Sequence, residues 1–124
     1  MTPKQERDCL AYDPFQGDDV QERILSDKMV NARKSGPCVI CLETIQPGER
    51  IRRQAAIVDG EMFSCRMCEA CCVAAAASWE DAGEAIDHRT SIGMARARAQ
   101  QDAERSERET TQARLDELRA REEV

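Results

Sequence analysis

The sequence predicts a small α+β domain followed by a charged helix. Three observations support this fold class: two Cys-x2-Cys pairs at 38–41 and 68–71, residues typical of a β-hairpin between the pairs, and a helix-forming composition after the second pair. Four thiolates at this spacing can surround one zinc ion in a tetrahedron. The expected cofactor is therefore one structural Zn²⁺ per chain, which would hold a knuckle, a hairpin and a helix together.

The composition predicts an apolar core too thin to fold without such an ion. Of the 124 residues, 41% are hydrophobic, but 17 are Ala, 7 are Cys, and aromatic residues make up 3% of the chain. Ordering one residue costs about 1.5 kcal/mol, whereas a structural zinc site supplies about 10–16 kcal/mol of apparent binding free energy. The odd cysteine count and the lack of a recognisable signal peptide favour metal ligands over disulfides. We expect a cytoplasmic protein without a membrane segment.

Three regions are expected along the chain. Residues 1–34 carry few large apolar side chains and are predicted to be an N-terminal arm, mostly loop, with turn residues at 13–19 and a short strand at 28–33. Cys9 in this arm is expected to be a free thiol whose replacement by Ser has little effect. Residues 35–83 form the four-cysteine finger with its following helix, and residues 84–124 form a charged helical tail.

The register of the predicted hairpin selects the metal ligands. A two-residue turn at 59–60 would place Arg53 opposite Arg66 and would bring Cys68 back beside the first cysteine pair. Cys65 would lie about 10 Å farther along the strand, given the rise per residue. The predicted ligands are Cys38, Cys41, Cys68 and Cys71. Cys65 remains an alternative ligand if the register differs, and Cys72 is expected to be a small buried residue.

The segments after the second pair favour helix. Residues 72–79 are rich in Ala, and this helix is expected to end near Gly83. Residues 89–124 contain eight Arg and eight acidic residues, several of them paired at i,i+4, which is typical of an exposed helix. Leu115 and Leu118 interrupt the charges, so this helix is a candidate for self-association or for a protein partner.

Arginines gather on the predicted hairpin, and two interpretations stay open for them. They could balance the negative charge of a zinc tetrathiolate, or they could contact a small anion or a nucleic acid. The residues concerned are Arg50, Arg52, Arg53 and Arg66.

The order of knuckle, hairpin and helix resembles a treble-clef zinc finger. The stretches 38–49, 58–60 and 68–72 resemble a loose group of small phage and prophage proteins, whose pattern is Cys-x2-Cys, Ile, Gly-Glu, an Asp-Gly hairpin and a second Cys-x2-Cys. The resemblance covers about residues 28–79 and implies the fold and the metal. A RING finger is excluded because a second set of Cys and His ligands is missing. An HNH nuclease is unlikely on chemical grounds because no His lies between the two cysteine pairs.

The expected function is that of a non-enzymatic zinc-binding module that interacts with a protein. The net charge of −6 disfavours nonspecific binding to DNA, and no catalytic constellation is recognisable around His88, which is expected to lie on the surface. The phage resemblance would make the chain an accessory or regulatory factor that acts on a host or phage protein. The alternative is a nucleic-acid-binding transcriptional regulator that uses the hairpin arginines.

Overall fold

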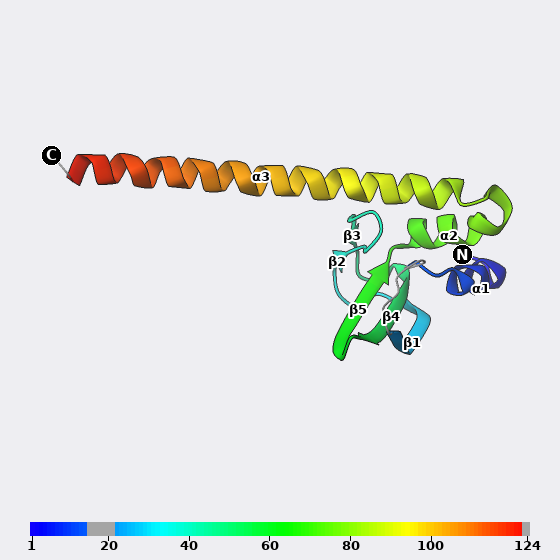
Figure 1. Ribbon diagram of the computed structural model, residues 1–124. Helices are drawn as coiled ribbons and strands as arrows, with labels where there is room; N and C mark the ends of the chain where they lie inside the picture. The colour runs from blue at the N-terminus through cyan, green and yellow to red at the C-terminus, as the bar shows by residue number, and fades with distance from the viewer. Residues whose placement is uncertain (15–21, 123–124) are drawn as a thin grey trace.

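The computed structural model describes residues 1–14 and 22–122, and it forms a small α+β domain from which one helix projects (Figure 1). The elements follow in the order α1 (Pro3–Ala11), β1 (Glu22–Asn31), β2 (Gly36–Pro37), β3 (Thr44–Ile45), β4 (Arg50–Val58), β5 (Glu61–Met67), α2 (Glu69–Asp81) and α3 (Glu84–Glu122). Strands β1, β4 and β5 form an antiparallel sheet with β4 in the centre, and β2 pairs with β3. None of the described helices combines the length and apolar character needed to cross a bilayer.

The hairpin of β4 and β5 has the predicted register. Arg53 pairs with Arg66 and Ile57 pairs with Met62. Asp59 and Gly60 have φ angles of 50° and 82°, the left-handed values that a tight two-residue hairpin turn requires. The sheet pairing ends at Met67, so Cys68 leaves the sheet and begins α2. The register therefore fixes which cysteine returns to the first pair.

The N-terminal region is more ordered than predicted. Residues 3–11 form α1, which a capping box between Thr2 and Gln5 and a proline at its start stabilise. The expected short strand at 28–33 is part of the ten-residue strand β1, which pairs with β4 over most of its length. The prediction of an arm that is mostly loop is wrong because β4 offers β1 a full edge. The predicted turn at 13–19 lies largely outside the described residues.

The core is small and rich in cysteine. One cluster of fourteen buried residues contains six Cys and four Ala, and its large aliphatic members are Ile45, Ile51, Met67 and Ile86. Helices α1 and α2 pack against each other beside one face of the sheet, while the first turns of α3 cover α2 (Figure 1). A core of this composition buries little apolar area for a domain of this size. Polar contacts must therefore contribute more to the stability of the fold.

Arg52 ties α1 to the sheet. Its side chain is 3% exposed and makes a bidentate ion pair with Asp27 of β1, with distances of 2.8 and 2.7 Å. The same guanidinium donates to the carbonyl oxygens of Cys9 and Tyr12 at 2.9 and 2.7 Å. These carbonyls lie at the end of α1, where the Cys9 carbonyl also accepts from the amide of the C-cap residue Tyr12 at 3.0 Å. Arg52 therefore closes the C-terminal end of α1 onto β4.

We expect Arg52→Ala to lower the free energy of unfolding by about 3 kcal/mol, because the half-buried carboxylate of Asp27 and the Tyr12 carbonyl would lose their cation. Arg53→Ala is the matched control, since Arg53 is the next residue but is exposed on the opposite face of the sheet. It should change stability by less than about 0.5 kcal/mol. Urea unfolding of both variants measures the difference, and equal losses would contradict this role of Arg52.

Candidate metal centre

Four buried cysteines form a cluster that could hold a metal ion. The sulfur atoms of Cys38, Cys41, Cys68 and Cys71 all lie within 4.8 Å of one another. The Sγ atoms of Cys41 and Cys68 are 3.7 Å apart. Four sulfurs at about 2.3 Å from a central zinc would have tetrahedral edges of about 3.8 Å. The cluster therefore has the dimensions of a four-thiolate metal site.

The first pair of ligands lies in a tight turn between β2 and β3. The amide of Cys38 donates to the carbonyl of Glu43 at 2.9 Å, and the amide of Leu42 donates to the carbonyl of Cys38 at 3.0 Å. Leu42 has a φ of 61°, so the chain reverses through a left-handed residue that is not glycine. The amides of Ile40 and Glu43 then point at Sγ of Cys38 and Cys41, each at 3.4 Å. Amide donors of this kind stabilise thiolates.

The second pair of ligands lies at the beginning of α2. Cys68 is the N-cap residue of the helix and Cys71 lies in its first turn. The positive end of the helix dipole therefore faces the sulfurs, which favours thiolates. The amide of Cys68 donates to Sγ of Cys38 at 3.3 Å and so joins the two pairs. Glu49 accepts from the amide of Glu69 at 3.0 Å and caps the helix in place of a Cys68 side-chain bond.

Arg89 of α3 contacts three of the four sulfurs. Its Nε lies 3.5 Å from Sγ of Cys71, and its Nη2 lies 3.3 Å from Sγ of Cys41 and 3.9 Å from Sγ of Cys68. The guanidinium also pairs with Glu43 at 3.3 Å. The hydrogen bond to Cys71 favours the charged guanidinium and raises the pKa of Arg89. A permanent cation at this place offsets the negative charge that four thiolates and a divalent ion would carry.

Helix α3 approaches the metal-ligand turn closely enough to need a glycine. A Cβ atom on Gly93 would lie 1.8 Å from the carbonyl oxygen of Ile40, so the two backbones touch there. Three residues later, Arg96 donates to the carbonyl of Cys41 at 2.9 Å. Asp81 accepts from the amides of Gly83 and Ala85 and so caps the beginning of α3. The first part of α3 is thus fixed to the cluster.

Hydrogen bonds between the thiols of the cluster shift the pKa values of several of them strongly. Hydrogen bonds from Cys68 and Cys71 place the pKa of Cys38 far below the usual range of a thiol. The same hydrogen bond to Cys38 raises the pKa of Cys68 to about 12. The pKa of Cys71 is also raised, by its hydrogen bonds to Cys38 and Cys68, although Arg89 opposes that shift. A divalent cation bound by the four sulfurs would displace the protons of the thiols.

The alternative ligand Cys65 lies outside the cluster. It pairs with Gln54 across the hairpin, and its Sγ donates to Oε1 of that residue at 3.8 Å. The observed register thus brings Cys68, and not Cys65, to the first cysteine pair. Cys72 is fully buried, as expected for a small apolar residue.

The hairpin arginines do not act as one group. Arg52 is buried on the helix-covered face, which removes it from the predicted anion contacts. Arg50 pairs with Glu6 of α1 at 2.6 Å, and Arg66 donates to the carbonyl of Lys34 at 2.8 Å. The cation beside the sulfurs is Arg89, which sequence reasoning missed. Its signal in the sequence is a glycine inside a charged helix with Arg89 four residues before it and Arg96 three residues after it.

Cys9 is a free thiol, as predicted, but it is fully buried. A hydrogen bond from the Cys72 thiol lowers the pKa of Cys9 and raises that of Cys72. Cys9 therefore belongs to the contact between α1 and α2. Burial bears on the predicted small effect of Cys9→Ser, because the new hydroxyl would lie in that contact. His88 lies exposed on α3, as expected.

We expect Arg89→Gln to weaken binding of Zn²⁺ or Co²⁺ by about 10–100-fold, because partners of metal ligands typically contribute that much to affinity. Arg98→Gln removes the same charge from an exposed position of the same helix and should leave the affinity unchanged. Competition against a chelator measures both affinities. Equal affinities for the two variants would contradict the role of Arg89.

Comparisons of this chain with protein-family models, with curated proteins and with solved structures found no match. The chemistry of the site therefore rests on its own geometry.

Proposed function

We propose that Cys38, Cys41, Cys68 and Cys71 bind one structural zinc ion. The observation that carries this proposal is the cluster of four buried sulfurs with Arg89 against three of them. Zinc is the metal that four thiolates in a tetrahedron most commonly hold. The order of turn, hairpin and helix around the site supports a treble-clef-like finger, and the resemblance to phage and prophage proteins would place the chain among them.

The zinc ion of this proposal is structural and not catalytic. A shell of four thiolates leaves no open coordination position for water or substrate. Amides of the turn and the beginning of α2 surround the sulfurs and would serve to fix them. The ion would thus stabilise the fold, which has few large apolar residues in its core.

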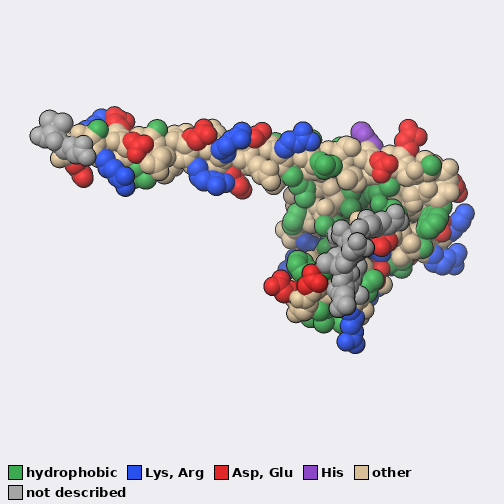
Figure 2. Space-filling view, in the orientation of Figure 1, with side chains coloured by type: hydrophobic (Ala, Val, Ile, Leu, Met, Phe, Trp, Pro, Cys, Tyr) green, Lys and Arg blue, Asp and Glu red, His purple; other side chains and the backbone are tan. Residues whose placement is uncertain are grey.

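The functional element of this proposal is α3, which would bind a protein partner or a second copy of the chain. Its first turns are fixed to the metal-ligand turn, whereas its later part projects beyond the domain (Figure 1). The space-filling view shows charges of both signs along this projection, with few apolar side chains between them (Figure 2). Leu115 and Leu118 are 47% and 54% exposed and lie on one face, at i and i+3. In a phage setting, such a module would be an accessory or regulatory factor.

Elemental analysis of the purified chain should find one zinc ion per molecule. Cys68→Ser should lose the ion and unfold residues 35–83, while Cys65→Ser, three residues away, should retain both. Acid should release the ion because protons compete for the thiolates, and a chelator should lower the thermal midpoint of the wild-type chain. Loss of zinc from Cys65→Ser would contradict the assigned ligand set.

The double variant Leu115→Ser, Leu118→Ser should abolish capture of a protein partner and any self-association. Zinc content and the thermal midpoint should stay unchanged, because both leucines lie on the projecting part of α3. Ala113→Ser, Ala120→Ser is the matched control on the same helix. Affinity capture followed by mass spectrometry and sedimentation velocity would measure the two effects. Capture and association that survive in the leucine variant would exclude this surface.

A further inference from the structure

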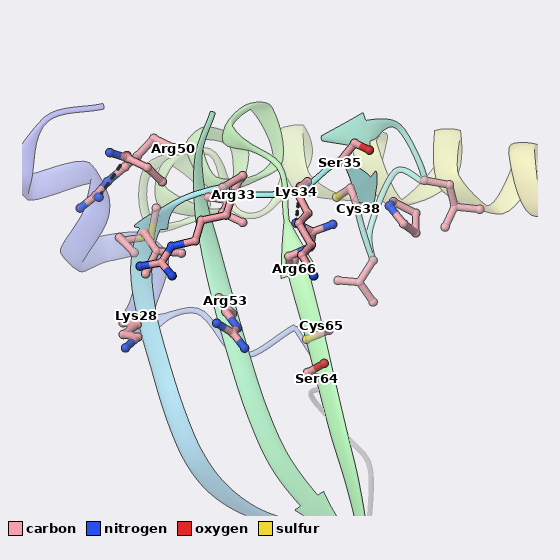
Figure 3. A pocket seen from close by; sticks show the side chains of 18 residues that line it. Lys28, Arg33, Lys34, Ser35, Cys38, Arg50, Arg53, Ser64, Cys65 and Arg66 are labelled. Atoms are coloured by element: carbon pink, nitrogen blue, oxygen red, sulfur yellow. Dashed lines mark hydrogen bonds between the residues drawn. The ribbon is translucent and has the colours of Figure 1, made fainter. Parts of the chain in front are cut away.

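A concave surface on the sheet face opposite α1 and α2 gathers positive charge, and among the described residues only Arg50 of its cations forms an ion pair, with Glu6. The concavity has a volume of about 1280 Å³, and Figure 3 shows its lining side chains on β1, β4, β5, the link after β1 and the segment that contains Cys38. Six of the eighteen described residues that line it are basic, and none of these eighteen is acidic. The basic residues are Lys28, Arg33, Lys34, Arg50, Arg53 and Arg66.

Three of these cations form a row across the three strands. Lys28 of β1 pairs with Arg53 of β4, and Arg53 pairs with Arg66 of β5. Like charges directly opposite on neighbouring strands destabilise a sheet. In the described part of the chain, no carboxylate forms an ion pair with any of the three. An arrangement that costs stability and has no internal counter-ion is typical of a site for an external anion.

The acidic net charge of the whole chain gives no indication of this locally basic surface. The first 88 residues contain ten Lys and Arg against sixteen Asp and Glu, yet six of those ten cations line one concavity. Residues 89–124 are neutral, with eight charges of each sign. A local field of this kind attracts a polyanion even when the whole molecule is acidic. The net charge therefore does not exclude binding of nucleic acid here.

We propose that this concave basic face binds the sugar–phosphate backbone of a nucleic acid without reading its bases. Guanidinium groups match phosphate geometry, and the hydroxyls of Ser35 and Ser64 add donors that commonly contact phosphate. The described residues of the lining include no aromatic side chain on which a base would stack. The volume exceeds the range of about 300–1,000 Å³ that small-molecule sites occupy, which fits a segment of polymer.

An acidic peptide fits this surface less well. Protein partners usually insert aromatic or aliphatic anchors into apolar pockets. Among the aliphatic lining residues Ile51 is 1% exposed and Val39 is 37% exposed, but the row across the strands itself consists of the cations Lys28, Arg53 and Arg66. The proposal is independent of a protein partner for α3. It needs the folded domain but none of the exposed leucines of that helix.

The test uses the zinc-loaded full chain and fluorescence anisotropy with a short labelled duplex DNA, measured over rising salt. Wild-type binding should weaken as salt increases. Lys28→Gln, Arg53→Gln should reduce affinity at least about tenfold and lower the salt slope by about two, one per lost phosphate contact. Arg105→Gln, Arg108→Gln removes the same charge from exposed α3 and should change affinity by less than about twofold.

Further binding measurements distinguish a nucleic-acid backbone from a specific DNA sequence and from an acidic peptide. Similar binding of duplexes that differ in base sequence supports the proposal, whereas a strong preference for one sequence would overturn it. Tighter binding of a labelled poly-glutamate peptide than of DNA would overturn it as well, as would no binding of DNA or equal losses in the two double variants. Failure of these arms leaves zinc content and partner capture by α3 unaffected.

A stability measurement guards against variants that misfold. Arg53→Gln should raise the thermal midpoint at low salt by about 2 °C, because it removes repulsion from both neighbouring strands. The gain should shrink as salt screens the charges. A lower midpoint for Arg53→Gln would show that the row serves the fold and would overturn its assignment as a ligand site.

Discussion

Four sulfur atoms in contact with one another are the constraint on which the rest of this structure depends. They come from two segments separated by 27 residues in sequence, and the hairpin between them exists in the register that brings Cys68 back to Cys41. Amides from the first turn and from the beginning of α2 converge on the same atoms. A core of alanines and cysteines could not impose this convergence by apolar burial alone.

The polar contacts around the cluster extend its influence to both ends of the chain. Arg89 and Arg96 join α3 to the ligand turn, and Arg52 joins α1 to the sheet. Each of these arginines donates to acceptors that lie in or beside the core: sulfurs, a turn carbonyl or the last carbonyls of a helix. In a chain with few aromatic residues, arginine contacts join the helices to the domain where a larger apolar core would do so in other proteins; Arg52 is the buried one of the three.

Local signals in the sequence predicted the site, and long-range contacts explain what they missed. The Asp59–Gly60 turn and the cysteine spacing were sufficient to choose Cys68 over Cys65, because strand pairing is regular once the turn is known. The ordered structure of residues 1–14 and of β1 depends on pairing with the edge of β4 and on the contacts of Arg52. No local sequence pattern predicts these long-range contacts. The role of Arg89 was hidden for the same reason, since it lies in a helix whose other charges face solvent.

The close backbone contact at Gly93 fixes the first part of α3 beside the sulfurs and leaves the rest of the helix projecting. A small rotation about this contact would move the far end a long way. At about 1.5 Å per residue, the part of α3 beyond Arg96 extends about 40 Å. A rotation of about 10° about the Gly93 contact would move the far end of α3 by about 7 Å. A sub-ångström rearrangement of the cysteine turn would therefore be amplified into a displacement of several ångströms at the far end of α3.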